Sequence, residues 1–359
     1  MKDDAKREAA INKILRMVAP GTVLREGIEN ILRAKTGGLI VVGATETVLS
    51  MMDGGFAIQC DLTPSHLYEL AKMDGAIIIS EDAKKVHYAN TTLNPDHTIP
   101  TSETGTRHRT AERVARQSGQ LVICISQRRN VITLYQGNLK YVLRDISVIL
   151  AKANQALQTL EKYKTVLEQE LTDLSALEFE EAVTLEDVTR VLQRFETVLR
   201  VTNEIRRYII ELGNEGRLVS MQLEELVSDV DEQAYLLIKD FVHPECPHTP
   251  HQIMSQIHNL SSEELLDGAL LARILGYPPS VNQLEESVPS RGYRILNKIS
   301  RLPQPVIENL VEHFGILSNI LKASMADLDK VEGVGPVRAR MIQNGLGRIQ
   351  EQVLIDRQI

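Results

Sequence analysis

The sequence predicts a multidomain protein that combines an α/β domain with all-α domains. Short apolar runs of strand length alternate with helical patterns up to about residue 146, which predicts a mixed sheet flanked by helices. From there to about residue 284 the hydrophobic period is helical, which predicts a central helical spine. Short helical segments around a glycine turn follow. We therefore expect three domains, over residues 1–146, 147–284 and 285–359.

The elements expected in the first domain follow from run length and from the glycines that bound the runs. Apolar, β-branched runs predict four strands: Leu39–Val42, Ala76–Ser80, Leu121–Ser126 and Val131–Tyr135. Helical spacing predicts helices over these residues: 11–18, 24–32, 65–72 and 109–118. Because the last two strands flank the polar residues 127–130, we expect them to form a hairpin.

Helices are expected throughout the rest of the chain. Those of the spine should cover these residues: 146–171, 184–212, 217–242, 252–259 and 262–275. Thr184 to Asp187 has the pattern of a capping box at the start of the second of these helices. Beyond a linker at Pro278-Pro279, helical patterns cover these residues: 293–300, 303–314, 316–323, 325–330 and 336–353. Nothing in the spine indicates chemistry.

The composition excludes several classes of protein. Of the 359 residues 43% are apolar and 25% charged, and no apolar run approaches the roughly 18 residues of a membrane span. The charged N-terminus lacks the apolar core of a secretory signal, and three cysteines are too few for a disulfide framework. We therefore expect a cytoplasmic protein with no membrane partner.

The charge is unevenly distributed along the chain. Residues 147–284 carry 11 basic and 23 acidic residues, a net charge of −12, whereas residues 1–146 and 285–359 carry +3 and +1. Anionic partners such as DNA or a nucleotide are therefore expected at the two ends.

The segment Leu328–Ile342 has the pattern of a helix-hairpin-helix. A Gly-Val-Gly turn follows an apolar helix end and precedes a helix with a small residue on its packing face. The two glycines are expected to take otherwise forbidden φ values and to bring backbone N–H groups to a phosphate. The DNA-binding candidates are Gly333, Val334, Gly335, Arg338 and Arg340. A neighbouring basic face is expected from Arg291, Arg294, Lys298 and Arg301. Such contacts bind the DNA backbone rather than bases, and a tight turn without a ligand is the alternative.

The first domain contains neither a P-loop nor a dinucleotide-binding glycine fingerprint. It has two other motifs. Asp74-Gly75-Ala76 stands directly before a predicted strand, where a carboxylate beside glycine could hold Mg²⁺. Residues 104–110, Thr-Gly-Thr-Arg-His-Arg-Thr, open a predicted helix, and its N-terminus with two arginines suits a polyphosphate. The alternatives are an ordinary turn and a solvated helix cap.

The two motifs together, ahead of an acidic helical spine and a helix-hairpin-helix, resemble the bacterial DNA integrity scanning proteins, which are diadenylate cyclases. The resemblance covers essentially the whole chain, and Asp74-Gly75-Ala76 and Arg107-His108-Arg109 match both signature motifs of the cyclase domain. It implies condensation of two ATP into cyclic di-AMP and two pyrophosphates, at sites formed between two facing cyclase domains of a homo-octamer. It also implies binding of branched DNA, such as recombination intermediates, which lowers synthesis, and a nucleoid-associated location.

The resemblance also implies roles for individual residues. Asp74 would bind the metal, Mg²⁺ or Mn²⁺, and help to activate the attacking 3′-hydroxyl. The triplet Arg107, His108 and Arg109 would act in catalysis. The implied ATP-binding residues are Gly75, Ala76, Leu93, Thr106, Arg107, His108, Arg109, Thr110, Ser126 and Arg128.

Two other interpretations remain open. The chain could be a DNA-binding structural protein that senses ATP without cyclising it. It could also be a metal enzyme centred on the loop with His243, Cys246, His248 and His251, near His258, although three prolines there suit an interdomain loop. We expect Cys60 and Cys124 to be small buried hydrophobes. The preferred DNA structure, the choice between Mg²⁺ and Mn²⁺, and the path of coupling do not follow from the sequence.

Overall fold

The computed structural model describes residues 2–279 and 283–357. The chain forms two compact units, one of Met1–Gln155 with Ile205–Met221 and the other of Ala156–Glu204 with Gln222–Ile359. Because the boundaries fall inside long helices, the division into three domains stays a prediction.

The first unit is built on a mixed sheet, as the sequence predicts. Among the described residues, eight strands form it in the order β2-β5-β4-β1-β6-β7-β8, with β3 paired to β5. Only the β1–β4 pair is parallel, and the other pairs are antiparallel. The strands are β1 Gly38–Val42, β2 Met52–Asp53, β3 Phe56–Asp61, β4 Ala76–Ile79, β5 Lys85–Leu93, β6 Leu121–Ser126, β7 Val131–Gln136 and β8 Leu139–Val142.

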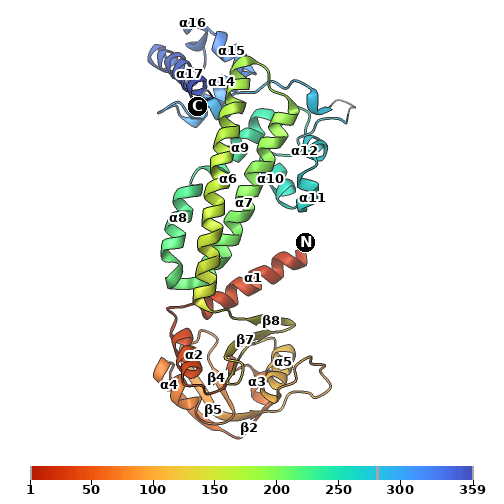
Figure 1. The fold of residues 1–359 in the computed structure, drawn as a ribbon, viewed down its shortest axis with the longest axis vertical. Coiled ribbons are helices and arrows are strands. Elements are labelled where there is room, and N and C mark those ends of the chain that lie inside the picture. The colour runs from red at the N-terminus through yellow and green to blue at the C-terminus, as the bar shows by residue number, and fades with distance from the viewer. Residues whose placement is uncertain (1, 280–282, 358–359) are drawn as a thin grey trace. The chain divides into compact units, whose positions relative to one another are not determined.

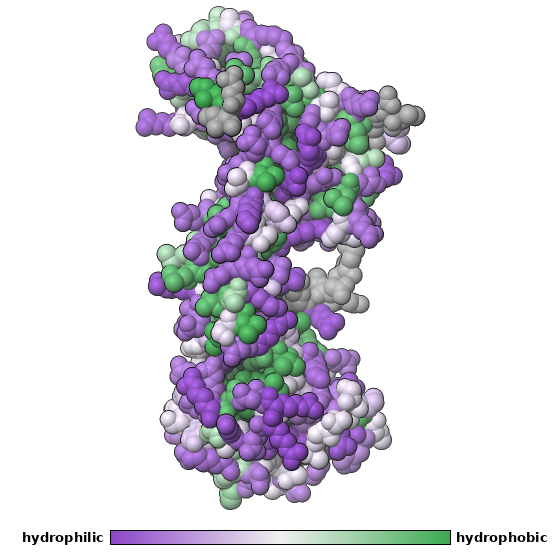
Figure 2. Space-filling view, viewed as in Figure 1, coloured by the Kyte–Doolittle hydropathy of each residue, from purple (hydrophilic) through white to green (hydrophobic). Residues whose placement is uncertain are grey.

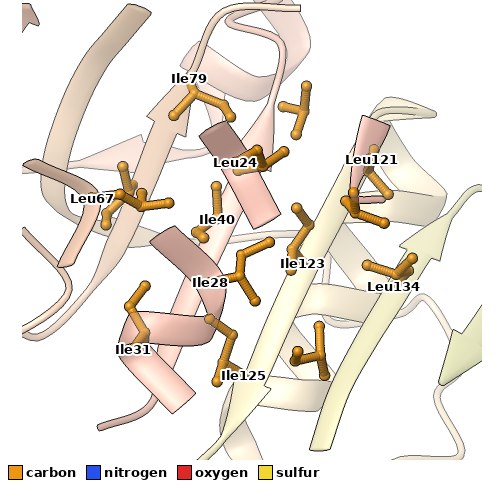
Figure 3. Packing of buried hydrophobic residues seen from close by; sticks show 14 of the residues in the cluster. Leu24, Ile28, Ile31, Ile40, Leu67, Ile79, Leu121, Ile123, Ile125 and Leu134 are labelled. Atoms are coloured by element: carbon orange, nitrogen blue, oxygen red, sulfur yellow. The ribbon is translucent and has the colours of Figure 1, made fainter. Parts of the chain in front are cut away.

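Helices cover both faces of the sheet (Figure 1). One face carries α1 (Lys2–Met17), α2 (Val23–Arg33) and α4 (Pro64–Leu70), and the other carries α3 (Glu46–Ser50) and α5 (Thr106–Ser118). Side chains alternate between two cores, so that Ile123 packs towards α2 and its neighbours Val122 and Cys124 pack towards α5. Figure 3 shows α2 placing its apolar stripe on the central strands. Cys124 is fully buried, which confirms it as a small hydrophobe, and burial raises the pKa of its thiol to about 12. Cys60 packs against the other core but is only partly buried.

The strands that the sequence analysis missed are the more polar ones. The strand β3 has mostly exposed residues, and β2 and β8 are short. The strand β5 is interrupted by a bulge in which Asn90 takes a φ of 56°. None of these strands has the continuous apolar run that identifies a buried strand.

The long helices are α6 (Ile146–Glu180) and α7 (Leu185–Leu212). The capping box before α7 is confirmed, since the Asp187 carboxylate accepts the Thr184 N–H at 3.0 Å and the Asp187 N–H donates to the Thr184 hydroxyl at 3.3 Å. The prediction of a single helix over 217–242 is wrong. The chain forms α8 (Arg217–Val227) and α9 (Val230–Phe241), and Asp229, the residue before α9, accepts a hydrogen bond from Lys164 at 2.7 Å.

The second unit also contains a series of short helices. The predicted helix over 262–275 is divided at Asp267, whose side chain accepts the Leu270 N–H at 3.1 Å and so starts a new helix. The remaining elements are η1 Gly213–Gly216 (which belongs to the first unit), α10 Pro250–His258, α11 Ser262–Leu265, α12 Gly268–Ile274, η2 Gln283–Glu285, α13 Tyr293–Asn297, α14 Gln304–Phe314, α15 Leu317–Lys322, α16 Met325–Leu328 and α17 Pro336–Asp356.

The basic face expected around α13 is confirmed for Lys298 and Arg301, which are exposed, and is wrong for Arg291 and Arg294. Arg294 is only 2% exposed, and its guanidinium pairs with the buried carboxylate of Glu178 on α6. Arg291 donates to the backbone carbonyls of Lys239 and Val242, both at 2.6 Å. The charges of these two arginines therefore hold the second unit together and do not face an external anion.

No helix within residues 2–279 and 283–357 combines the length and the apolar character that a bilayer span requires. The face of the molecule in Figure 2 is mainly hydrophilic, with scattered hydrophobic side chains.

Candidate active site and nucleic-acid interface

Strand register brings separate sequence segments to one edge of the sheet. Thr91 of β5 pairs with Ala76 of β4, Ala76 pairs with Leu39 of β1, and Leu39 pairs with Cys124 of β6. These four residues therefore form one row across the sheet. The strands β1 and β4 begin beside this row, whereas β5 and β6 end just beyond it. The segments before β1 and β4 and after β5 and β6 consequently emerge at the same edge.

Most of the predicted ATP-binding residues lie at that edge. Asp74 and Gly75 precede β4 and are exposed. Leu93 ends β5 and is 7% exposed, within the core on the α5 side of the sheet. Ser126 ends β6 and is half-buried, and Arg128 is exposed in the turn that follows. The structure therefore places the Asp74 carboxylate, the Ser126 hydroxyl and the Arg128 guanidinium at the end of the sheet next to this row of four residues.

Gly75 has a structural reason to be glycine. Its φ is +99°, and a Cβ there would lie 2.8 Å from the Thr91 carbonyl oxygen and 2.9 Å from the Asn90 carbonyl carbon. The Thr91 hydroxyl in turn donates to the Ala76 carbonyl at 3.1 Å. The turn that carries Asp74 is thus fixed against the bulge of β5, which the sequence analysis did not predict.

The helix α5 begins at this edge without a side-chain cap. Its N-cap residue is Gly105, and the carbonyl of Gly105 accepts the Arg109 N–H at 2.9 Å. The preceding N–H groups of the first turn have no partner within a helix, so they are available to an anion. Thr106 and Arg109 are exposed, whereas Arg107, His108 and Thr110 are half-buried.

Arg107 connects the start of α5 to the start of β1. A Cβ on Gly37 would lie 1.8 Å from Nη1 of Arg107 and 2.9 Å from its Cζ. Glycine at this position therefore makes room for the guanidinium. The sequence shows the Thr36-Gly-Gly38 segment, but nothing in it indicates that Gly37 belongs to the site.

His108 ends a buried chain of hydrogen bonds. Its Nδ1 lies 2.9 Å from the Tyr135 hydroxyl, which donates to the Glu103 carboxylate at 2.9 Å. Lys140 forms an ion pair with the same carboxylate. The other ring nitrogen, His108 Nε2, is buried and has no hydrogen-bond partner. The sequence analysis missed Glu103, Tyr135 and Lys140, because only the fold brings β7 and β8 under the start of α5.

The surroundings determine the charge states of this chain. Burial lowers the pKa of His108, and the charges of Arg129, Lys140 and Arg107 lower it further against the opposing effect of Glu103. Burial acts to raise the pKa of Glu103, but hydrogen bonds from Lys140 and Tyr135 bring it below its usual range. Burial and the Glu103 carboxylate raise the pKa of Tyr135. At neutral pH the chain therefore holds an ionised Glu103, a protonated Tyr135 and a neutral His108.

Arg129 is a further residue that the sequence analysis missed. It follows Arg128 in the β6–β7 turn, and its charge acts on His108. Arg128 and Arg129 are both exposed in this turn.

In the C-terminal hairpin the two turn glycines differ. Gly333 has a φ of +81°, as expected, and a Cβ there would lie 3.2 Å from Val306 Cγ2. Gly335 has an extended backbone, with φ −103° and ψ 176°, and a Cβ there would meet nothing within 4 Å. The prediction that both glycines take forbidden φ values is therefore wrong for Gly335, and the fold itself does not require a glycine there.

The hairpin also separates its packing residues from its exposed ones. Val334 and Ala339 are buried in the core of the C-terminal helices, with 5% and 0% exposure, so Val334 can offer only its backbone to a ligand. Arg338 and Arg340 are exposed, and Arg338 Nη1 donates to the Gly333 carbonyl at 2.6 Å. Gly335 starts α17 without a side-chain cap. The helix start, the open glycine and two arginines therefore form an exposed cationic surface.

The histidines and the cysteine of the proline-rich loop contact different groups. His243 packs edge-on against Tyr277, His251 stacks on Tyr235, and Cys246 Sγ lies 3.9 Å from the Ile274 carbonyl oxygen. Within the residues that the structure describes, no three His, Cys, Asp or Glu side chains are grouped so that they could hold a metal ion.

Comparison with known proteins matches the nucleotide-binding region and the helical spine to family models. Residues 25–139 match the family model of the DisA bacterial checkpoint controller nucleotide-binding region, and residues 143–284 match that of the DisA linker region. A DNA integrity scanning protein DisA from Bacillus pumilus is 58% identical over 353 residues, covering 98% of each chain. The chain belongs to the DisA family. The DisA protein of Bacillus subtilis is 56% identical over 358 residues, 100% of this chain and 99% of that one.

The family assignment confirms the resemblance seen in the sequence, and the chain is a diadenylate cyclase. This excludes the alternative of a nucleotide sensor without cyclase activity. Among solved structures, that of DacA from Staphylococcus aureus is 20% identical and covers 40% of this chain and 91% of that chain, with a TM-score of 0.29.

Proposed function

We propose that the sheet edge at Asp74 and the start of α5 bind one ATP, and that two such edges face each other to join two ATP into cyclic di-AMP. We further propose that the C-terminal hairpin binds branched DNA and thereby lowers synthesis. One observation carries the first proposal: the uncapped start of α5, with Arg107, His108 and Arg109, lies at the same edge as Asp74.

The residues at this edge suit the parts of ATP. The free N–H groups of α5 and the guanidinium groups of Arg107 and Arg109 would bind the phosphates and stabilise the charge of the departing pyrophosphate. Thr106, Thr110, Ser126, Arg128 and Arg129 would add contacts from the same edge. Leu93 would line the adenine pocket, since it ends β5 beside the same row of residues.

A divalent cation fits the donor set of this edge. Asp74 is an exposed carboxylate, and no cluster of three protein ligands accompanies it among the described residues. Mg²⁺ is commonly held by one or two carboxylates together with substrate phosphates, so Asp74 and the bound ATP would supply its ligands. When bound, the cation would make the 3′-hydroxyl more acidic and neutralise phosphate charge. Asp74 itself would accept a hydrogen bond from that hydroxyl and orient it towards the facing α-phosphate.

The symmetry of the product requires two copies of the site. In cyclic di-AMP each adenosine is both attacking alcohol and phosphate donor, so two equivalent half-sites related by a twofold axis suit the reaction. A twofold interface brings the same patch of each protomer together. We propose this arrangement within a homo-octamer.

The DNA proposal is supported by Gly335. Because neither φ nor packing requires glycine there, the open space beside its Cα suits the close approach of an external phosphate to the start of α17. Arg338 and Arg340 would add charge, and contacts to phosphates do not depend on base sequence. DNA binding would place the protein at the nucleoid in the cytoplasm.

Two measurements test these proposals. The rate of cyclic di-AMP formation per protomer should fall when the protein is diluted until its assembly dissociates, and a monomer that keeps the full rate would contradict the two-copy site. Binding to a four-way junction should weaken steeply with salt and change little when bases are exchanged at constant shape. Binding that is insensitive to salt would contradict the phosphate contacts.

A further inference from the structure

The hydrogen-bond chain Glu103–Tyr135–His108 leads from the Glu103–Lys140 ion pair to the start of α5. We propose that Glu103 and Tyr135 are positioning residues of the cyclase, which hold the His108 ring in the tautomer protonated at Nδ1 and so keep Nε2 free for the substrate. This inference rests on the proposed place of His108 in the active site.

The direction of each hydrogen bond follows from the donors present. Glu103 pairs with the Lys140 ammonium, so its carboxylate is ionised and can only accept. The Tyr135 hydroxyl has one hydrogen, and that hydrogen is donated to Glu103 at 2.9 Å. The hydroxyl oxygen can then only accept from His108 Nδ1, 2.9 Å away. Nδ1 therefore carries the proton, and in the neutral ring Nε2 has a free lone pair.

The position of Nε2 connects this chain to the substrate. It is buried and lacks a partner, although an unpaired buried polar atom is costly in a folded protein. The ring belongs to the first turn of α5, beside the free N–H groups and the two arginines. A ligand seated on that turn is the partner that the unpaired nitrogen lacks.

The orientation of the ring is fixed from behind. Tyr135 is 1% exposed in the core between α5 and the sheet, and its ring meets that of His108 edge-on at 6.2 Å between centroids. Glu103 lies in the segment before α5, and Lys140 lies on β8. Hydrogen bonds and an ion pair therefore connect β7, β8 and the segment before α5 to Nδ1 of His108, and Nε2 remains free. Such support behind a functional side chain holds it in its productive geometry.

Two variants and a matched control test the inference in the full-length protein. Tyr135→Phe removes only the hydroxyl, and Glu103→Gln removes the ionised acceptor. We expect kcat to fall about tenfold or more in both while the KM for ATP changes less than about threefold, because the phosphate-binding groups remain. The control is Tyr141→Phe. Tyr141 also donates from a half-buried phenol to a buried carboxylate, that of Glu211 at 2.9 Å, but on the other face of the sheet.

The tautomer is read directly from the nitrogen-15 spectrum of His108. The wild-type and Tyr141→Phe proteins should show a protonated Nδ1 and an unprotonated Nε2, whereas Tyr135→Phe should show a shift towards protonation at Nε2. Unchanged kcat and an unchanged spectrum in Tyr135→Phe would overturn the inference. If Tyr135→Phe fails to fold, Glu103→Gln gives the same two readouts. Full activity of His108→Ala would instead contradict the proposed active site itself.

Discussion

The helices α5 and α17 begin in the same way and are held in different ways. Each starts at a glycine without a side-chain cap and carries two arginines in its first turns. At α5 the arginine and histidine contact the protein, since Arg107 lies against Gly37 and His108 bonds to Tyr135. At α17 the space beside Gly335 is open and both arginines are exposed. The two helix starts therefore differ in how closely the surrounding protein would fix the position of a bound anion.

This difference matches the two tasks. Catalysis requires that reacting groups are held within fractions of an ångström, and the contacts behind α5 provide that restraint. Binding to DNA of any sequence requires charge and access more than exact placement. Under the proposed functions, the same local structure would serve catalysis at α5, where contacts with the sheet hold the side chains, and DNA docking at α17, where Arg338 bonds only to the adjoining turn.

The largest loss of activity should follow substitution of Asp74, because the start of α17 has no carboxylate that corresponds to it. Asp74→Asn should lower cyclase turnover at least about a hundredfold, because an amide is a poor ligand for a hard cation and a poor proton acceptor. DNA binding and assembly should be unchanged. Asp61→Asn, an exposed carboxylate at the end of β3, is the control and should keep wild-type turnover. Near wild-type turnover in Asp74→Asn would contradict the assignment of Asp74 as metal ligand and proton acceptor.

The next largest loss of ATP binding or turnover should follow substitution of the two arginines of α5. Replacing Arg107 and Arg109 by alanine removes charge-assisted hydrogen bonds, each worth roughly 1.5–3 kcal/mol when well formed, so ATP affinity or turnover should fall at least about tenfold. Arg33→Ala, an exposed arginine on α2, should have little effect. If both parameters are unchanged in the double variant, the arginines are merely solvated.

A matched pair of substitutions tests the comparison directly. Gly105→Asn and Gly335→Asn each introduce a residue that caps its own helix, so the fold should be as stable as before or more so. The new side chain would occupy the N–H groups that an anion needs. We expect Gly105→Asn to weaken ATP binding about fivefold and to spare DNA, and Gly335→Asn to weaken DNA binding about fivefold and to spare ATP. Gly347→Ala, within α17, is the control for both.

The smallest expected effect is a difference in pH dependence. The His108 pKa lies below its usual 6.5, because burial and the charges of Arg129, Lys140 and Arg107 outweigh Glu103. Since the neutral ring leaves Nε2 free, kcat should stay level from pH 8 down to 6.5 and fall only at lower pH. DNA binding rests on guanidinium groups and should not change over this range. A kcat that rises as the pH falls below 6.5 would show that protonated His108 is the active form.

The sequence predicted those parts of the fold that local pattern controls. The apolar runs identified β1, β4, β6 and β7, and Thr184 with Asp187 identified the start of α7. The strand β5 was not predicted, because a bulge at Asn90 interrupts its alternation of buried and exposed residues. The motifs predicted which residues would face the ligand, but the contacts behind them did not follow from the sequence.

Contacts between distant segments explain the remaining errors. Arg294 belongs to a basic stretch, and only tertiary packing brings it to Glu178, 116 residues away. Tyr135 lies in an ordinary hydrophobic strand, and only the position of α5 shows that its hydroxyl supports His108. Neither partner could be chosen from the sequence by itself.

The buried ion pair also determines how the DNA sensor should be disabled. Deletion of residues 285–359 would remove Arg294 and Ser290, whose side chains bond to Glu178, and would leave that carboxylate without these partners. Loss of one partner of a buried pair is strongly destabilising, so the deletion would confuse instability with loss of sensing. A substitution at Gly335 avoids this problem.

The most direct test is the cyclase rate without DNA and with a four-way junction at the concentration that half-inhibits the wild-type protein, measured for the wild-type, Gly347→Ala and Gly335→Asn proteins. The junction should lower the rate of the wild-type protein and of Gly347→Ala. Gly335→Asn should show the same rate as the wild type without DNA and little inhibition when the junction is added. If Gly335→Asn is inhibited as fully as the wild type, the start of α17 is not the DNA sensor, and the division of work between the two helix starts is wrong.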